Sequence, residues 1–217
     1  MNGRKGFYVD SGSNHATQMS NSLFFDWCLG WNGLCVEPDP EYHEGIRKYR
    51  TCTLVPECIS DRDQELKFTF AGAGGHVSSN DSSTNTTVHC SSLESILQRE
   101  NRKDMIIDFW SLDVEGHEMT VLRSVNFDKI HVDVMSIEDM HIPVRELDQL
   151  MYESNFIKMF ELPLDSLYVN QRLLSSKGGN IGEYIGNIWL PSRYQQYKEG
   201  NLKFRAPLNL RCFDQLK

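Results

Sequence analysis

Short apolar runs alternate along the chain with longer segments in which apolar residues recur at helical spacing. The runs that we interpret as buried strands are residues 6–9, 34–37, 105–112 and 131–137. Helical spacing is found at residues 17–29, 40–49, 92–98 and 118–125, and in a segment that begins at Pro143. This alternation predicts an α/β fold, with a mostly parallel sheet and helices on both of its faces.

Other segments give less regular patterns. Residues 52–59 are a third strand, although Pro56 is awkward inside a central strand. Residues 65–70 alternate and are expected to add a strand, whereas residues 71–87 are rich in Gly, Ser, Asn and Thr and are expected to form a long loop or lid. Residues 156–161 and 166–170 fit a closing antiparallel pair. We treat 1–217 as a single domain in which 171–217 is a C-terminal extension of unassigned structure.

Acidic residues stand where several of the predicted strands end. They are Asp10, Glu37, Asp113 and the pair Glu138-Asp139. The carboxyl ends of parallel strands meet at one edge of an open α/β sheet, where ligands bind. The turn after the first strand contains Gly12, and the acid of the second strand follows it at the distance typical of a ribose-binding carboxylate. The sequence therefore predicts a nucleotide site at this edge.

Composition and charge narrow the choice of partners. The net charge of −8 argues against nucleic acid, because phosphate binding needs a basic face. No apolar stretch is long enough to span a membrane, and the first residues do not form a signal peptide. The chain begins almost directly on its first strand, so we expect it to be one domain of something longer.

The six cysteines are scattered, with no CxxC pair, which makes a zinc site an unattractive interpretation. Cys35 lies in an apolar strand and is expected to be a small core residue. We therefore predict a reducing, cytoplasmic setting. The glycosylation sequons that begin at Asn80 and Asn85 are interpreted, without a secretion signal, as parts of a solvated loop.

Two sets of residues resemble the hallmarks of the FkbM-type methyltransferases. The first consists of YVDSGSN (8–14), SNS (20–22) and LGWNGLCVEPDP (29–40), and the second is LDVEGHE (112–118), followed by Val121 and Leu122. The resemblance covers about 6–170. It implies a class I methyltransferase fold, Rossmann-like, with a seven-stranded sheet and a final antiparallel strand. It also implies S-adenosylmethionine as cofactor and methyl transfer to oxygen, often on a sugar or a glycosylated small molecule. With such an acceptor, the longer protein is expected to be a fusion with other glycan-modifying domains.

The sequence departs from that family at two places. The family usually has a further glycine after the asparagine of the first turn, where this chain has His15-Ala16-Thr17. The family also usually has residues before the first strand that help to cover the cofactor. Both departures bear on how firmly this chain would hold S-adenosylmethionine.

Candidate cofactor residues follow from the strand ends and from the resemblance. We expect Glu37 to accept hydrogen bonds from the two ribose hydroxyls, and Asp61 to accept one from the adenine amine. The residues assigned to the cofactor are Asp10, Gly12, Ser13, Asn14, Ser20, Asn21, Glu37, Ser60, Asp61 and Asp113. Each also has a structural interpretation, such as a strand-end turn at Gly12 or a loop cap at Asp61.

Candidate catalytic residues cluster at and after the last two of these acidic ends, Asp113 and the pair Glu138-Asp139. Asp113, Glu138 and Asp139 form a possible set of oxygen ligands for Mg²⁺, which would hold the acceptor hydroxyl and lower its pKa. A histidine titrates near neutral pH, so His117, or as a second choice His141, is a candidate general base. The structural alternative is that these side chains only order turns or are solvated.

Three functions remain open on this evidence. The first is an S-adenosylmethionine-dependent O-methyltransferase that acts on a carbohydrate hydroxyl. The second is a NAD-dependent oxidoreductase, but its turn needs three glycines at set spacing and only Gly12 is present. The third is a non-catalytic module that retained the fold for binding.

Overall fold

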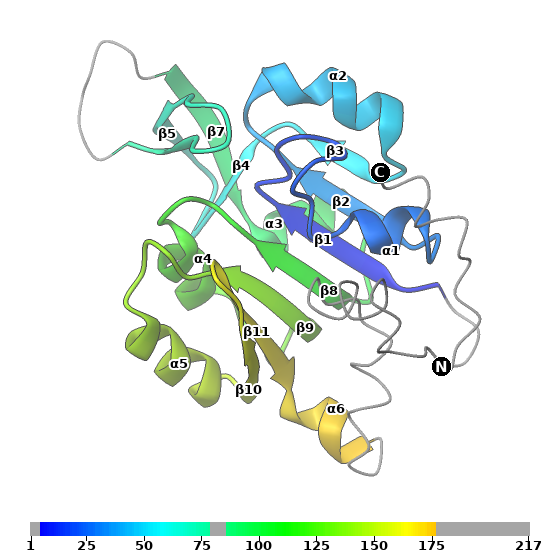
Figure 1. Ribbon diagram of the computed structural model, residues 1–217, viewed down its shortest axis with the longest axis vertical. Helices are drawn as coiled ribbons and strands as arrows, with labels where there is room; N and C mark the ends of the chain where they lie inside the picture. The colour runs from blue at the N-terminus through cyan, green and yellow to red at the C-terminus, as the bar shows by residue number, and fades with distance from the viewer. Residues whose placement is uncertain (1–4, 79–85, 177–217) are drawn as a thin grey trace.

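The computed structural model describes residues 5–78 and 86–176, which form the coloured ribbon of Figure 1. A seven-stranded sheet is its centre, in the order β10-β11-β9-β8-β1-β2-β3. Its strands are β1 (Phe7–Ser11), β2 (Asn32–Val36), β3 (Thr53–Val55), β8 (Ile106–Leu112), β9 (His131–Glu138), β10 (Phe156–Glu161) and β11 (Asp165–Asn170). Only β11 runs antiparallel to its neighbours within this sheet. The predicted class I fold, with its antiparallel strand near one edge, is confirmed.

Helices cover both faces of this sheet, as predicted. They are α1 (Leu23–Trp27), α2 (Pro40–Tyr49), α3 (Leu93–Arg99), α4 (Glu118–Ser124), α5 (Val144–Glu153) and α6 (Gln171–Ser176). One apolar core joins Phe7 and Val9 to α3, α4 and α5, and the other joins Tyr8 to α1, α2 and Leu173 of α6. Successive side chains of a strand point to opposite faces, so β1 serves both cores.

Local chemistry sets the limits of the helices. Helix α2 begins as predicted, because the Asp39 side chain accepts a hydrogen bond from the backbone N–H of Glu41 and Pro40 occupies the first turn. The helix predicted at 17–29 is wrong in extent, because only Leu23–Trp27 is helical. Met19 has a φ of 54° and an exposed fraction of 82%, a backbone conformation that no α-helix contains.

A second, four-stranded sheet with the order β4-β7-β5-β6 lies beside the first. Its strands are β4 (Cys58–Ser60), β5 (Gln64–Thr69), β6 (His76–Val77) and β7 (Thr86–Ser92). The single strand predicted at 52–59 is therefore two strands in different sheets, with Pro56 in the break between them. The predicted strand at 65–70 is confirmed as β5. Part of the predicted 71–87 loop is instead strand, because β7 starts with polar residues that give no apolar alternation.

Two disulfides contradict the prediction of reduced cysteines. Cys35 of β2 is bonded to Cys52, and Cys58 of β4 is bonded to Cys90 of β7. Cys35 is buried in the core as predicted, but as half of a disulfide. None of the cysteines in the described ranges is free. Disulfides persist mainly in oxidising compartments, so the cysteine argument for a cytoplasmic setting was wrong.

Within the two described ranges, no helix is both long enough and apolar enough to cross a lipid bilayer. The sequons that begin at Asn80 and Asn85, and most of the extension predicted at 171–217, lie outside the described residues.

Candidate functional site

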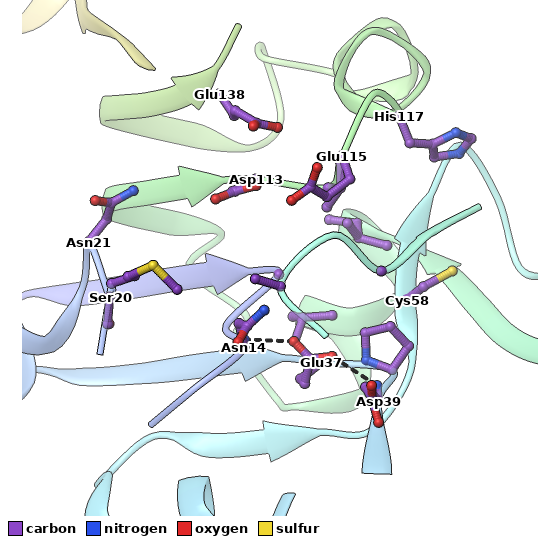
Figure 2. Close-up of a pocket in the computed structure, with 18 of the residues that line it drawn as sticks. Asn14, Ser20, Asn21, Glu37, Asp39, Cys58, Asp113, Glu115, His117 and Glu138 are labelled. Carbon is purple, nitrogen blue, oxygen red and sulfur yellow. Dashed lines mark hydrogen bonds between the residues drawn. The ribbon is translucent and has the colours of Figure 1, made fainter. Parts of the chain in front are cut away.

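A cavity of about 670 Å³ opens at the carboxyl ends of β1, β2, β8 and β9 (Figure 2). This volume is in the range of pockets that bind small molecules and cofactors. Glu37 and Asp113 both line it, so the two acids that follow β2 and β8 share one space, as the sequence predicted. The loop after β1 and the small sheet complete its walls.

Glu37 presents a buried carboxylate that the backbone fixes in place. One of its oxygens accepts the N–H of Asn14 at 2.7 Å and the other accepts the N–H of Asp39 at 2.8 Å, as the dashed lines in Figure 2 show. Its side chain lines the cavity although the residue is only 5% exposed. The pKa of Glu37 is raised to about 7, mainly by burial and in part by the neighbouring charges of Asp39 and Asp10, while the two backbone N–H groups act in the opposite direction. Each oxygen retains a lone pair for a ligand hydroxyl.

Gly12 brings the first turn against the loop after β8. Its φ is 80°, and an added Cβ would lie 1.7 Å from the backbone oxygen of Asp113. The Gly12 N–H donates to the carbonyl of Val36 at 3.0 Å. Only glycine satisfies both the positive φ and this close approach. The ends of β1, β2 and β8 are thus locked together by backbone contacts under the cavity.

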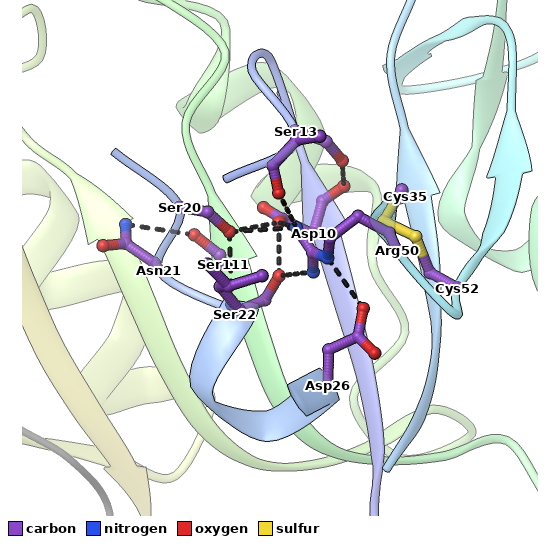
Figure 3. Close-up of polar contacts among 12 residues, drawn as sticks. Asp10, Ser13, Ser20, Asn21, Ser22, Asp26, Cys35, Arg50, Cys52 and Ser111 are labelled. Carbon is purple, nitrogen blue, oxygen red and sulfur yellow. Dashed lines mark hydrogen bonds and ion pairs between the residues drawn. A yellow bond between two sulfur atoms is a disulfide. The ribbon is translucent and has the colours of Figure 1, made fainter. Parts of the chain in front are cut away.

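The Asp10 carboxylate does not line the cavity and instead belongs to a buried network around Arg50 (Figure 3). It accepts a hydrogen bond from Ser22 and lies 3.7 Å from Arg50 Nη1. Arg50 also binds Asp26 at 2.7 Å. A buried charge needs such partners, so this network holds the segment between β1 and α1 in a non-helical path.

The other residues predicted from the first motif divide between this network and the cavity. Ser13 is buried and its hydroxyl donates to the Asp10 carbonyl at 2.7 Å, away from the cavity lining. Asn14, Ser20 and Asn21 do line the cavity. Ser20 accepts a hydrogen bond from Arg50 at 3.0 Å, which links the buried network to the cavity wall.

The small sheet supplies an apolar wall that the sequence analysis missed. Ile59, Phe68 and Val77 line the cavity from β4, β5 and β6. Ser60 and Asp61, predicted at this place, do not line it. The Ser60 hydroxyl instead contacts Asp61, and the side-chain amide of Gln64 donates to Asp61 at 2.7 Å. Inward positions in a strand alternate with outward ones, so the alternation already visible in β5 could have revealed Phe68.

His117 lines the cavity on the side of this wall. Its Nε2 lies 3.0 Å from the Ser60 hydroxyl, and in Figure 2 its ring points toward β4 and away from Glu138. Burial lowers the pKa of His117, so the imidazole is neutral near pH 7. The two histidines of the sequence prediction therefore lie at different places, because His141 lies with Glu115, its Nε2 being 3.3 Å from a carboxylate oxygen.

Four carboxylates gather at the opposite end of the cavity. Asp113, Glu115, Glu138 and Asp165 all line it. Burial raises the pKa of Asp113, and the nearby Glu138 raises it further. Burial also raises the pKa of Glu138, with Glu115 as the largest neighbouring charge. Like charges disfavour ionisation of one another, so Asp113, whose pKa rises to about 8, holds a proton near neutral pH unless a cation or a hydroxylated ligand joins the group.

Two other acids near this group face elsewhere. Asp139 accepts a hydrogen bond from Ser166 and does not line the cavity, because it follows Glu138 and points to the other side of the chain. The predicted Mg²⁺ ligand set of Asp113, Glu138 and Asp139 is therefore not assembled. The buried Glu118 accepts the N–H groups of Val114 and Gly116, so it orders the loop after β8.

Comparison with known proteins identifies the family. Residues 10–160 match the model of the Methyltransferase FkbM domain. The chain belongs to the FkbM methyltransferase family. Both hallmark segments of the FkbM chain lie on the cavity, with Asn14 and Glu37 from the first and Asp113 and Glu115 from the second. The family is S-adenosylmethionine-dependent, which implies S-adenosylmethionine as the cofactor.

Among curated proteins, none matches the FkbM chain significantly. A solved structure, the S-adenosylmethionine-dependent methyltransferase from Agrobacterium tumefaciens, aligns with a TM-score of 0.39 at 10% identity. The alignment covers 77% of this chain and 56% of that one, so the FkbM chain spans little more than half of the bacterial protein. A similarity this low supports no further conclusion.

Proposed function

We propose that this chain is an S-adenosylmethionine-dependent O-methyltransferase that methylates a hydroxyl of a sugar or glycosylated molecule. One observation carries the proposal. The oriented carboxylate of Glu37 lies in the same cavity as the group formed by Asp113, Glu115 and Glu138. A ribose-binding acid at one place and several hydrogen-bond acceptors at another match a nucleoside cofactor beside a hydroxylated acceptor.

The cofactor end of the cavity fits the proposed ligand. Glu37 would accept both ribose hydroxyls, because the backbone already holds its two oxygens side by side. The apolar wall of Ile59 and Phe68 suits the flat face of adenine. His117, with Ser60, stands at the edge of that wall. S-adenosylmethionine supplies a methyl group whose bond to sulfur breaks, with the electron pair remaining on sulfur, as its bond to the acceptor oxygen forms.

The acceptor end is the acidic one. Asp113, Glu115 and Glu138 would accept hydrogen bonds from acceptor hydroxyls and fix the reacting oxygen, which contributes to rate through orientation. The proton of that hydroxyl would pass to this acidic group and then to water. His141 does not line the cavity, but its contact with Glu115 puts it next to the acidic end, whereas His117 contacts Ser60, so we assign the acceptor side to His141 and not to His117. Roles for Asp10 and Ser13 are limited to positioning the first turn.

The disulfides bear on where the chain works. Cys35–Cys52 and Cys58–Cys90 fit an oxidising compartment better than the predicted cytoplasm. We therefore propose an oxidising setting, such as a secretory compartment. Alkylation of free thiols before and after reduction, followed by mass spectrometry of the protein from its own cells, tests this. Cysteines that are already alkylated before reduction would restore the cytoplasmic interpretation.

The activity is tested by incubating the chain with S-adenosylmethionine and a panel of glycans and glycosylated small molecules. Mass spectrometry should find a gain of one methyl group on at least one acceptor. A Glu37→Ala variant should lose this activity, whereas Glu41→Ala, an exposed acid in the first turn of α2, should keep it. Calorimetry with S-adenosylmethionine is run in parallel. Cofactor binding without methylation of any acceptor would favour the non-catalytic module, and absence of cofactor binding would refute the proposal.

A further inference from the structure

Three side chains meet beside the acidic end of the cavity, where Glu115 and Glu138 line it and His141 contacts Glu115 from behind that lining. One ligand atom each from Glu115, Glu138 and His141 lies within 4.8 Å of the others. Glu115 follows β8, Glu138 ends β9 and His141 lies in the loop after it. In Figure 2, Glu138 and Glu115 point toward the same space from these two strand ends. This spacing allows all three atoms to bind one ion after small side-chain movements.

Glu138 gives an independent indication that something is bound there. It is only 5% exposed, and within the described part of the chain no donor reaches its Oε2. A buried carboxylate oxygen without a partner costs free energy, and native proteins satisfy nearly all such atoms. Aspartates and glutamates surround this one, so a cation is the ligand that would satisfy Glu138 and relieve the repulsion together.

We propose that Glu115, Glu138 and His141 bind a divalent transition-metal cation beside the acceptor hydroxyl. Two carboxylates and one imidazole suit Mn²⁺ better than Mg²⁺, because Mg²⁺ prefers oxygen ligands alone. The ligand set differs from the sequence prediction, with Glu115 and His141 in place of Asp139. The use of the ion in methyl transfer depends on the function proposed above, but its binding does not.

The backbone holds the first of these ligands in a special conformation. Glu115 has a φ of 55° and Gly116 a φ of 94°, and a positive φ is uncommon for a residue other than glycine. The N–H of Gly116 donates to Glu118 at 3.2 Å, which stabilises the turn. A Cβ added at Gly116 would lie 3.5 Å from the Cβ of His141, so the turn packs directly beside the third ligand.

Three protein ligands leave coordination positions free for the acceptor. A bound hydroxyl in such a position loses its proton more easily and is held in a fixed direction. Asp113 lines the same end of the cavity, beside Glu138, so its carboxyl group lies where it can hydrogen-bond the bound acceptor. In this proposal Glu115, Glu138 and His141 hold the ion, and Asp113 helps to position the acceptor.

The test is a titration of the metal-free full chain with Mn²⁺, followed by electron paramagnetic resonance and calorimetry, with neither cofactor nor acceptor present. The parent protein should bind one Mn²⁺ saturably. Glu138→Gln and His141→Gln should each weaken binding by at least about 10-fold. The matched control is His131→Gln, at the other end of β9. The His131 side chain is 37% exposed, against 46% for His141, and it also contacts a carboxylate, that of Asp133 at 2.9 Å. It should bind Mn²⁺ like the parent.

The outcomes separate this inference from the proposed function. Absence of saturable binding by the parent, or equal binding by Glu138→Gln, would overturn the metal site. Thermal melting of each variant checks that it is folded. Binding of S-adenosylmethionine to the metal-free protein tests the cofactor end separately. The cofactor-binding result can therefore be interpreted even if the protein binds no Mn²⁺.

Discussion

The ionisation of Glu37 makes a quantitative prediction about cofactor affinity. Burial raises the pKa of Glu37 to about 7 in the free protein. Only the ionised carboxylate can accept hydrogen bonds from both ribose hydroxyls, because a protonated oxygen is a donor. Cofactor binding should therefore require the ionised form and weaken as the pH falls through the pKa. The backbone N–H groups of Asn14 and Asp39 favour the same ionised form.

The size of this change in affinity follows from the linkage between cofactor binding and the ionisation of Glu37. If bound ribose keeps Glu37 ionised, the dissociation constant for S-adenosylmethionine should rise about 30-fold between about pH 8 and about pH 5.5, or ~2 kcal/mol. The sign is fixed by the raised pKa, since the proton that Glu37 holds near pH 6 must be lost on binding. Binding should accordingly release about one proton per cofactor in that range and almost none near pH 8.

Calorimetry in two buffers of different ionisation enthalpy measures both quantities. Glu37→Gln keeps the size of the side chain but cannot titrate, so its affinity should be lower than that of the parent and nearly independent of pH. Other acids of the cavity are present in both proteins, and the difference between the two profiles therefore isolates Glu37. A parent whose affinity is the same at both pH values, or a variant with the same slope as the parent, would refute the ribose assignment.

Three further predictions concern stability. Gly12→Ala should lower cofactor affinity by more than about 10-fold and destabilise the fold by about 1–3 kcal/mol, because the positive φ of Gly12 and the adjacent Asp113 carbonyl exclude a side chain. The control Gly45→Ala, in α2, should leave the stability in urea unfolding unchanged or raise it by up to about 1 kcal/mol. Arg50→Met should cost about 3–5 kcal/mol, because two buried carboxylates lose their cation; an unchanged unfolding midpoint would contradict this. Replacing both Cys35 and Cys52 by serine should lower the free energy of unfolding by about 3 kcal/mol, because this disulfide closes a loop of 17 residues. A reductant should destabilise the parent protein by breaking this bond, whereas the double variant no longer has the bond to lose.

Periodicity predicted the main sheet well because most of its strands are buried on both faces. Val9, Leu34 and Val132 belong to continuous apolar runs that few other structures permit. The small sheet was harder to predict, because β7 begins with exposed threonines and is held by pairing with β5 and β4, which no local pattern reveals. The helix at 17–29 failed for a related reason, since contacts of Ser20 with the distant Arg50 override local helical spacing.

The candidate site was predictable only as far as strand ends define it. The positions of Glu37 and Asp113 follow from topology, because parallel strands bring their carboxyl ends to one edge. The direction of a side chain beyond the strand end does not follow. Asp139 points away from the cavity, and Glu115 points into it only because of a positive φ that no composition indicates.

The close contact of Gly12 with the Asp113 carbonyl has a consequence for the order of events during turnover. The loop after β1, which we propose receives the cofactor, and the loop that carries the acidic group touch through main-chain atoms, so neither can shift without displacing the other. Occupancy by the methyl donor should thereby pre-set the acceptor pocket. We expect an ordered sequence, with the donor arriving first and its demethylated product leaving last.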